Sequence, residues 1–162
     1  MTLRAQLRLV LSERFIPALK KRGFSGPDRL DGVSSCYNFT RPKGSDTEFV
    51  VIQFDKRKSP RFIINLWIEP PGGSEEIIRT KGIWMQGRVA PNRGVRTGQW
   101  FRADRPWWQR LIGNKTTLES DAVDQALSFL DAIEDWFREP RNTPAVRTLR
   151  FDWSMVKNEH TA

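Results

Sequence analysis

The side chains that most enzymes use for catalysis are scarce in this sequence. Histidine occurs once, at His160, and cysteine once, at Cys36. A Ser-His or Cys-His nucleophile pair needs an ordered imidazole beside the nucleophile, and a zinc site needs several His or Cys ligands. Neither GxxxxGK[S/T] nor GxGxxG occurs, so no phosphate-binding or dinucleotide-binding loop is indicated. We therefore expect no metal site and no cofactor.

Paired carboxylates are the remaining route to catalysis. Glu75 and Glu76 are adjacent, and Asp104 lies between Arg102 and Arg105. A neighbouring guanidinium keeps a carboxylate ionised, and an acid among bases is more often an ion-pair partner than a general base. The sequence identifies no second carboxylate beside Asp104. We therefore predict that the protein is not an enzyme.

The strongest candidate for a binding surface is the segment 79–115, which has nine bases and one acid and is rich in tryptophan. Seven of the nine bases are arginine, the residue that makes bidentate contacts and stacks on aromatic rings. The candidate binding residues are Arg88, Arg93, Arg96, Trp100, Arg102, Arg105, Trp107 and Trp108.

Three interpretations of this segment remain open. Bases interleaved with aromatics supply phosphate contacts and stacking platforms for RNA or single-stranded nucleic acid, although no RNP, helix-turn-helix or GXXG motif accompanies them. The same residue types form interface hot spots, to which an acidic protein partner would be steered. In the structural alternative, the tryptophans fill a second face of the sheet and the arginines pair with the acidic segment 116–139, which has seven acids and one base.

A second candidate surface is the predicted hairpin 49–68, FVVIQFDKRKSPRFIINLWI. Strand alternation puts Val50, Ile52 and Phe54 on one buried face with Ile64, Leu66 and Ile68, if Gln53 pairs with Asn65 or the register slips by two. The bases in the turn of this hairpin form either a solvated turn or a secondary electrostatic contact: Lys56, Arg57, Lys58 and Arg61.

The opposite face of this hairpin carries Gln53, Asn65 and Trp67. A buried amide must be satisfied, so Gln53 and Asn65 are expected either to bond to each other and fix the register, or to form the polar floor of a shallow pocket edged by Trp67. We prefer the bonded pair.

The remaining elements follow from periodicity and end signals. Apolar residues at helical spacing predict a helix over 3–22, which Pro17 should kink or split. A capping box at Thr116 and Glu119 predicts a helix over 117–138. Further strands are expected at 33–41, 83–89 and 98–102, and 145–156 adds a short strand or helix.

These elements predict an α+β fold: a mostly antiparallel sheet of four or five strands with an N-terminal and a C-terminal helix, the latter packed on the apolar face. The length predicts one domain over 1–156, followed by a loose tail at 157–162. The first residues are broken by Arg4, Arg8 and Glu13 before any signal-like apolar run, and no stretch approaches about 20 apolar residues, so we expect a cytoplasmic protein.

Short motifs occur in a recognisable order: LKKRGF (19–24), YNFTR (37–41), VIQFDK (51–56), FIINLWI (62–68) and PWW (106–108). In this order the chain resembles the bacterial Domain of Unknown Function 4304 family over residues 3–138. The resemblance implies a single cytoplasmic α+β domain without an established activity, and by analogy an immunity protein that neutralises a toxin.

The function we expect is therefore a non-enzymatic binding domain that recognises a protein partner, such as a toxin with an acidic contact surface. The alternative is RNA or single-stranded nucleic-acid binding through 79–115. Because the chain is basic, with a net charge of +8, it does not mimic nucleic acid as acidic nuclease inhibitors do.

Overall fold

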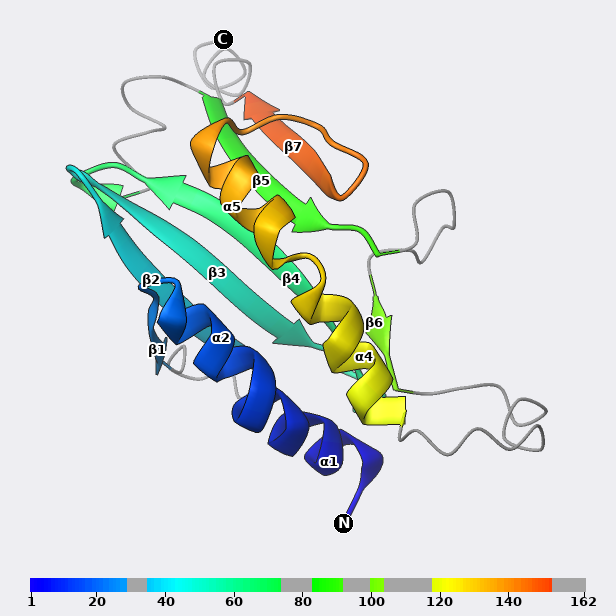
Figure 1. Ribbon diagram of the computed structural model, residues 1–162. Coiled ribbons are helices and arrows are strands. Elements are labelled where there is room, and N and C mark those ends of the chain that lie inside the picture. Colours follow the sequence, from blue (N-terminus) through cyan, green and yellow to red (C-terminus); the bar gives the residue numbers. More distant parts are fainter. Residues whose placement is uncertain (29–34, 74–82, 92–99, 104–117, 153–162) are drawn as a thin grey trace, which may run out of the picture.

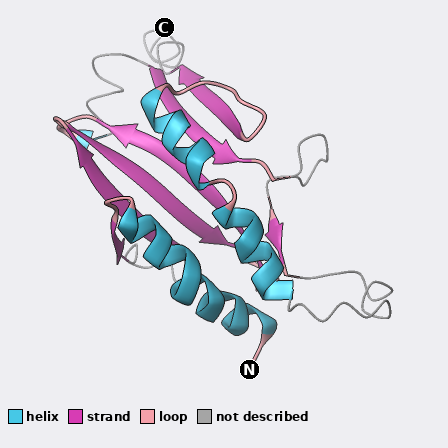
Figure 2. Cartoon of the chain, in the orientation of Figure 1, coloured by secondary structure: helices cyan, strands magenta, loops and turns pink. Residues whose placement is uncertain are grey.

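An antiparallel sheet covered on one side by helices forms the protein (Figure 1). The computed structural model describes residues 1–28, 35–73, 83–91, 100–103 and 118–152. The sheet has seven strands in the order β1-β2-β3-β4-β5-β7, and β6 pairs with β4 beside this path. Figure 2 shows the helices and the sheet as two layers. The predicted α+β class is confirmed.

The strands are β1 (Ser25–Asp28), β2 (Cys36–Lys43), β3 (Asp46–Phe54), β4 (Arg61–Glu69), β5 (Ile83–Val89), β6 (Phe101–Arg102) and β7 (Val146–Asp152). The helices are α1 (Leu3–Val10), η1 (Leu11–Phe15), α2 (Ile16–Lys21), α4 (Leu118–Leu127) and α5 (Leu130–Arg138).

The prediction of four or five strands was wrong, because both edges of the sheet are strands that sequence patterns mark weakly. At one edge, β1 has the sequence SGPD, which contains a glycine and a proline and lies outside the strands predicted from the sequence. Pro27 is tolerated there because an edge strand needs hydrogen bonds on one side only. At the other edge, β7 pairs with the whole of β5, from Ile83 opposite Asp152 to Val89 opposite Val146.

The predicted arrangement of an N-terminal and a C-terminal helix was also wrong. The second helical segment is not the last element, because β7 follows it. It is two helices, α4 and α5, separated at Ser128, whose hydroxyl donates to the Gln125 carbonyl over 2.7 Å. The N-terminal segment is divided by the π-helical η1, and α2 begins one residue before Pro17. Thr116, the first residue of the predicted capping box, lies outside the described residues, as does the predicted tail 157–162.

The hydrophobic core lies between the helices and one face of the sheet, which includes the hairpin β3-β4. Val51 pairs with Asn65, which is the predicted register with the two-residue slip, so the predicted faces are confirmed. Gly87 on β5 lets the ring of Trp136 from α5 approach the sheet. The buried residues of this face are Phe39, Val50, Ile52, Phe54, Phe62, Ile64, Leu66 and Val89, and the helices cover them with Leu7, Leu11, Phe15, Leu19, Val123, Ala126, Ile133, Trp136 and Phe137.

The side of the sheet opposite the helices is called the back face below. By register it carries Gln53 of β3, Asn65 and Trp67 of β4, Arg88 of β5 and Arg147 of β7. None of the helices α1, η1, α2, α4 and α5 lies on this side (Figure 1).

Candidate functional site

Three acids of α4 and α5 pair with arginines from the N-terminal third of the chain. The ion pairs are Arg14 with Asp124, Arg22 with Asp131 at 2.7 Å and Arg41 with Glu134 at 2.9 Å. Arg88, by contrast, lies on the back face and contacts Asn65. The alternative in which the arginines of 79–115 pair with the acidic segment is therefore wrong for Arg88.

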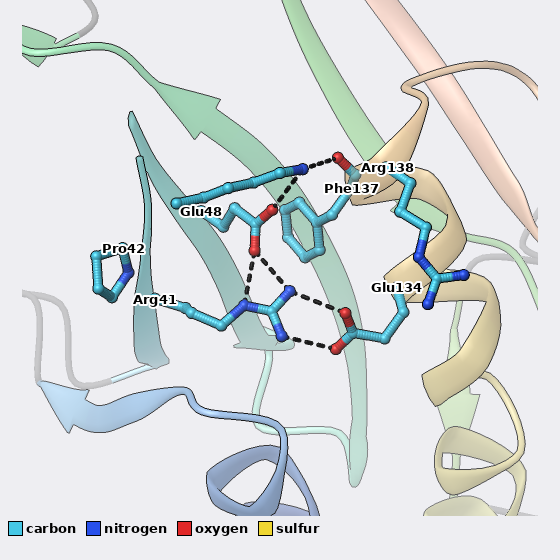
Figure 3. A pocket seen from close by; sticks show the side chains of 7 residues that line it. Arg41, Pro42, Glu48, Glu134, Phe137 and Arg138 are labelled. Atoms are coloured by element: carbon cyan, nitrogen blue, oxygen red, sulfur yellow. Dashed lines mark hydrogen bonds and ion pairs between the residues drawn. The ribbon is translucent and has the colours of Figure 1, made fainter. Parts of the chain in front are cut away.

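Arg41 is the centre of the most extensive of these networks (Figure 3). Its Nε donates to Glu48 Oε2 over 2.7 Å, and its two Nη groups donate to both oxygens of Glu134 over 2.9 Å. Glu48 is 1% exposed and also pairs with Lys43 at 3.1 Å. The guanidinium lies 4.2 Å from the centre of the Phe24 ring.

This network surrounds a shallow pocket of about 260 Å³ between the β2-β3 turn and α5. The two carboxylates that line it, Glu48 and Glu134, are both engaged by Arg41. These ion pairs join the β2-β3 hairpin to α5 and leave neither carboxylate free for a ligand. We therefore assign the network a structural role.

Residues from two predicted binding surfaces, the basic segment 79–115 and the turn of the hairpin 49–68, lie together at one end of the sheet. Trp100 and Arg102, from the basic segment, lie beside the hairpin turn: Arg102 pairs with Arg61 across β6 and β4, and the Ala103 amide donates to the Pro60 carbonyl over 2.9 Å. The Arg61 guanidinium lies 4.5 Å from the Trp100 ring centre. We call this surface the basic tip; it comprises Lys56, Arg57, Lys58, Arg61, Trp100 and Arg102.

Asp55 holds the turn in place. Its carboxylate accepts from the Arg57 amide over 3.0 Å and from Arg61 Nε over 2.7 Å, and its carbonyl accepts from Arg4 Nη1 over 2.8 Å. The Arg57 amide, followed by Arg61, holds the pKa of the Asp55 carboxyl below its usual range, against an opposing effect of burial. The Arg61 side chain therefore stabilises the turn through its bonds to Asp55.

The three bases between Asp55 and Arg61 face solvent. Lys56, Arg57 and Lys58 are exposed, and Lys58 has a φ of 63°. Their side chains form no ion pair with the described part of the chain. Three of the exposed bases of the basic tip are thus residues that had been predicted to form a secondary contact only.

A chain of hydrogen bonds crosses the middle of the back face. Arg88 Nε donates to Asn65 Oδ1 over 2.9 Å, and Asn65 Nδ2 donates to Gln53 Oε1 over 3.2 Å. The predicted amide pair is confirmed, and Arg88 is its third member. Trp67 is stacked on Phe49 with the ring centres 5.2 Å apart, and its Nε1 donates to Glu69 over 3.1 Å.

Two arginines of the candidate sites were not predicted from the sequence. Arg4 reaches the hairpin turn from α1, and Arg147 lies directly opposite Arg88. No local pattern marks either residue, because both positions depend on packing between distant parts of the chain. Several predicted residues lie outside the described residues: Arg93, Arg96, Arg105, Trp107, Trp108, Glu75, Glu76, Asp104 and His160.

The described residues bring no three His, Cys, Asp or Glu side chains together as a metal site. None of the described helices has the length and apolar character needed to cross a membrane. No protein-family model, curated protein or solved structure matches this chain. The function therefore has to be inferred from the geometry of the chain itself.

Proposed function

We propose that this protein is a non-enzymatic binding domain that recognises an acidic surface of a protein partner through the basic tip. The observation that carries the proposal is the segregation of charge. Asp124, Asp131 and Glu134 of α4 and α5 are paired on the helix side of the sheet. Lys56, Arg57 and Lys58, by contrast, project from the hairpin turn without an acidic counterpart in the described part of the chain.

The turn is built to present these charges. Asp55 and Arg61 bond to each other across its base, and Arg61 lies against Trp100, so the turn has a fixed shape before a partner arrives. A preorganised contact loses less conformational entropy on binding. Positive charge on such a projecting turn accelerates encounter with an acidic surface.

A protein partner fits the basic tip better than nucleic acid does. Single-stranded nucleic acid is bound through charge together with aromatic rings on which bases stack. Among the residues whose side-chain burial the structure describes, no aromatic side chain is exposed. Trp100 is only half-buried, but Arg61 lies over its ring. The basic tip thus offers charge without an open stacking platform.

The resemblance to the Domain of Unknown Function 4304 family supports a particular setting for this activity. We propose that the protein acts in the cytoplasm of a bacterium as an immunity protein, and that its partner is a toxin with an acidic contact surface. Binding, rather than catalysis, would then neutralise the toxin.

Fluorescence anisotropy with two labelled probes tests the proposal: a polyglutamate peptide, which stands for an acidic protein surface, and a single-stranded RNA of mixed sequence. The test variant is Lys56→Glu with Arg57→Glu. The control is Lys20→Glu with Lys21→Glu, an adjacent exposed pair on α2 with the same change in net charge. We expect the test variant to bind polyglutamate about tenfold more weakly than the control variant does. Charges that contact the partner contribute more to the affinity than equal charges elsewhere on the surface.

Equal weakening in both variants would show that only net charge matters and would overturn the proposal. Binding of RNA that is tighter than that of polyglutamate, resists added salt and is lost in the test variant would replace the protein partner by nucleic acid.

A further inference from the structure

Two arginines face each other on the back face of the sheet. Arg88 of β5 lies directly opposite Arg147 of β7. Like charges opposite each other on neighbouring strands destabilise a sheet. Within the described residues, neither guanidinium has an acidic partner. Two facing cations without a counter-charge destabilise the sheet until an anion binds between them. This is the arrangement expected of an anion-binding site before its ligand is bound.

Arg88 is held in a defined orientation. A guanidinium only donates hydrogen bonds, so the Asn65 oxygen must face Arg88 Nε and the Asn65 nitrogen must face Gln53 Oε1. Both bonds are formed, and Asn65 is 4% exposed. A buried amide thus fixes the rotation of the Arg88 side chain, with Nε engaged on the sheet side.

The remaining donors of Arg88 are the Nη1 and Nη2 groups at the end of its planar fork. Neither forms a hydrogen bond within the described part of the chain. Arg147 is exposed on the neighbouring strand and brings a second guanidinium to the same place. Burial, followed by the charge of Arg147, lowers the pKa of Arg88, which agrees with two cations held close together and partly shielded from water.

We propose that Arg88 and Arg147 form a binding site for a phosphate monoester group on the back face. The Nη end of Arg88 engages two oxygens and Arg147 a third, which a tetrahedral phosphate supplies and a carboxylate does not. Two guanidinium charges match the nearly two negative charges that a phosphate monoester carries.

This site is distinct from the basic tip. Arg88 is opposite Asn65, whereas Arg102 is opposite Arg61 four residues earlier on β4. At about 3.3 Å per residue, the two positions on β4 are roughly 13 Å apart. This exceeds the distance of about 10 Å beyond which salt largely screens exposed charges. The two proposals can therefore fail separately.

Nuclear magnetic resonance titration tests the site. Inorganic phosphate, O-phosphoserine and acetate are each added at constant ionic strength and at about pH 8, where a phosphate monoester is a dianion. The signals followed are the Arg88 Nε–H and the backbone amides of Gly87 and Thr148. We expect a saturable shift with both phosphate compounds and none with acetate. Tighter binding of O-phosphoserine than of phosphate would indicate a phosphorylated residue as the natural ligand, and equal binding would indicate free phosphate or a small phosphorylated molecule.

Two variants assign the effect to the two arginines. Arg147→Gln removes the exposed guanidinium, and Arg88→Lys keeps the charge but not the fork; each should bind phosphate about tenfold more weakly. Arg138→Gln, on α5 at the other side of the sheet, should bind as the wild type does. Shifts of equal size for phosphate and acetate, or phosphate binding that survives both Arg147→Gln and Arg88→Lys, would overturn the proposal.

Discussion

Arg41 and Arg88 are arginines on opposite sides of one sheet, and they differ in their hydrogen-bond partners. Arg41, on the helix side, bonds to two carboxylates and to the Arg22 carbonyl. Arg88, on the back face, bonds to one neutral amide within the described residues. The engaged donors of Arg41 stabilise the fold, whereas the Nη groups of Arg88, which bond to no other described residue, are the donors that we propose bind a ligand.

The comparison extends to the two faces as a whole. On the helix side, apolar packing is combined with ion pairs between arginines and three acids of α4 and α5. On the back face and at the basic tip, positive charge is presented. The net charge of the chain is therefore less informative than which charges are paired.

Removing the two arginines separately should give the largest contrast. Arg41→Ala leaves Glu48, which is 1% exposed, without its main partner, and breaking a buried ion pair costs about 3–5 kcal/mol. Arg88→Ala should cost only about 1–2 kcal/mol, because it deprives Asn65 of a donor but also removes one of two facing charges. Urea unfolding measures both values, and equal losses would break the comparison.

Adjacent residues of β5 sharpen the contrast at a smaller scale. A Cβ atom on Gly87 would lie 2.7 Å from Cε2 of Trp136, whose Nε1 is held by Thr148 Oγ1 at 2.9 Å. Gly87→Ala should therefore lower the free energy of unfolding by about 1–3 kcal/mol through overpacking. Gln86→Ala, on the back face, is the matched control and should change it by less than about 0.5 kcal/mol. If thermal unfolding shows both variants to be equally stable, the Trp136 ring is not packed tightly against Gly87.

The smallest effect concerns the basic tip and depends on pH. The folded-state pKa of Asp55 is lowered, so its ionised carboxylate contributes stability that is present above the unfolded pKa of about 3.9 and is lost as pH falls through the folded value. Asp55→Asn should cost about 1 kcal/mol at neutral pH, and its difference from the wild type should shrink below about pH 4. Melting temperatures over this range provide the measurement; a difference that persists unchanged in acid would show that Asp55 does not hold the turn by charge.

Sequence reasoning was most accurate where the pattern is local. Alternation in 49–68 predicted both faces of the hairpin and the Gln53–Asn65 pair, because strand periodicity and one shared turn determine them together. The strand 83–89 was also predicted with its observed bounds. The edge strand β1 was missed because an edge strand needs hydrogen bonds on one side only and can therefore contain Gly and Pro, which otherwise indicate a loop. At the other edge, 145–156 was predicted only as a short strand or helix.

The candidate sites were predictable only in part. Lys56, Arg57 and Lys58 are marked by their position in a turn, but nothing local shows that Trp100 and Arg102 lie beside them. The pairing of Arg88 with Arg147 joins residues that are 59 positions apart and depends on β7 returning beside β5. Such juxtapositions arise from the topology of the sheet, which charge and periodicity do not determine.

The most direct test of the central claim is to map where an acidic partner binds. Backbone amide shifts recorded during a titration with polyglutamate should change mainly in residues 55–61 and 100–103, which form the basic tip. Shifts that are largest on α2, or that are spread evenly over the exposed lysines and arginines, would contradict the proposal that the basic tip is the binding site.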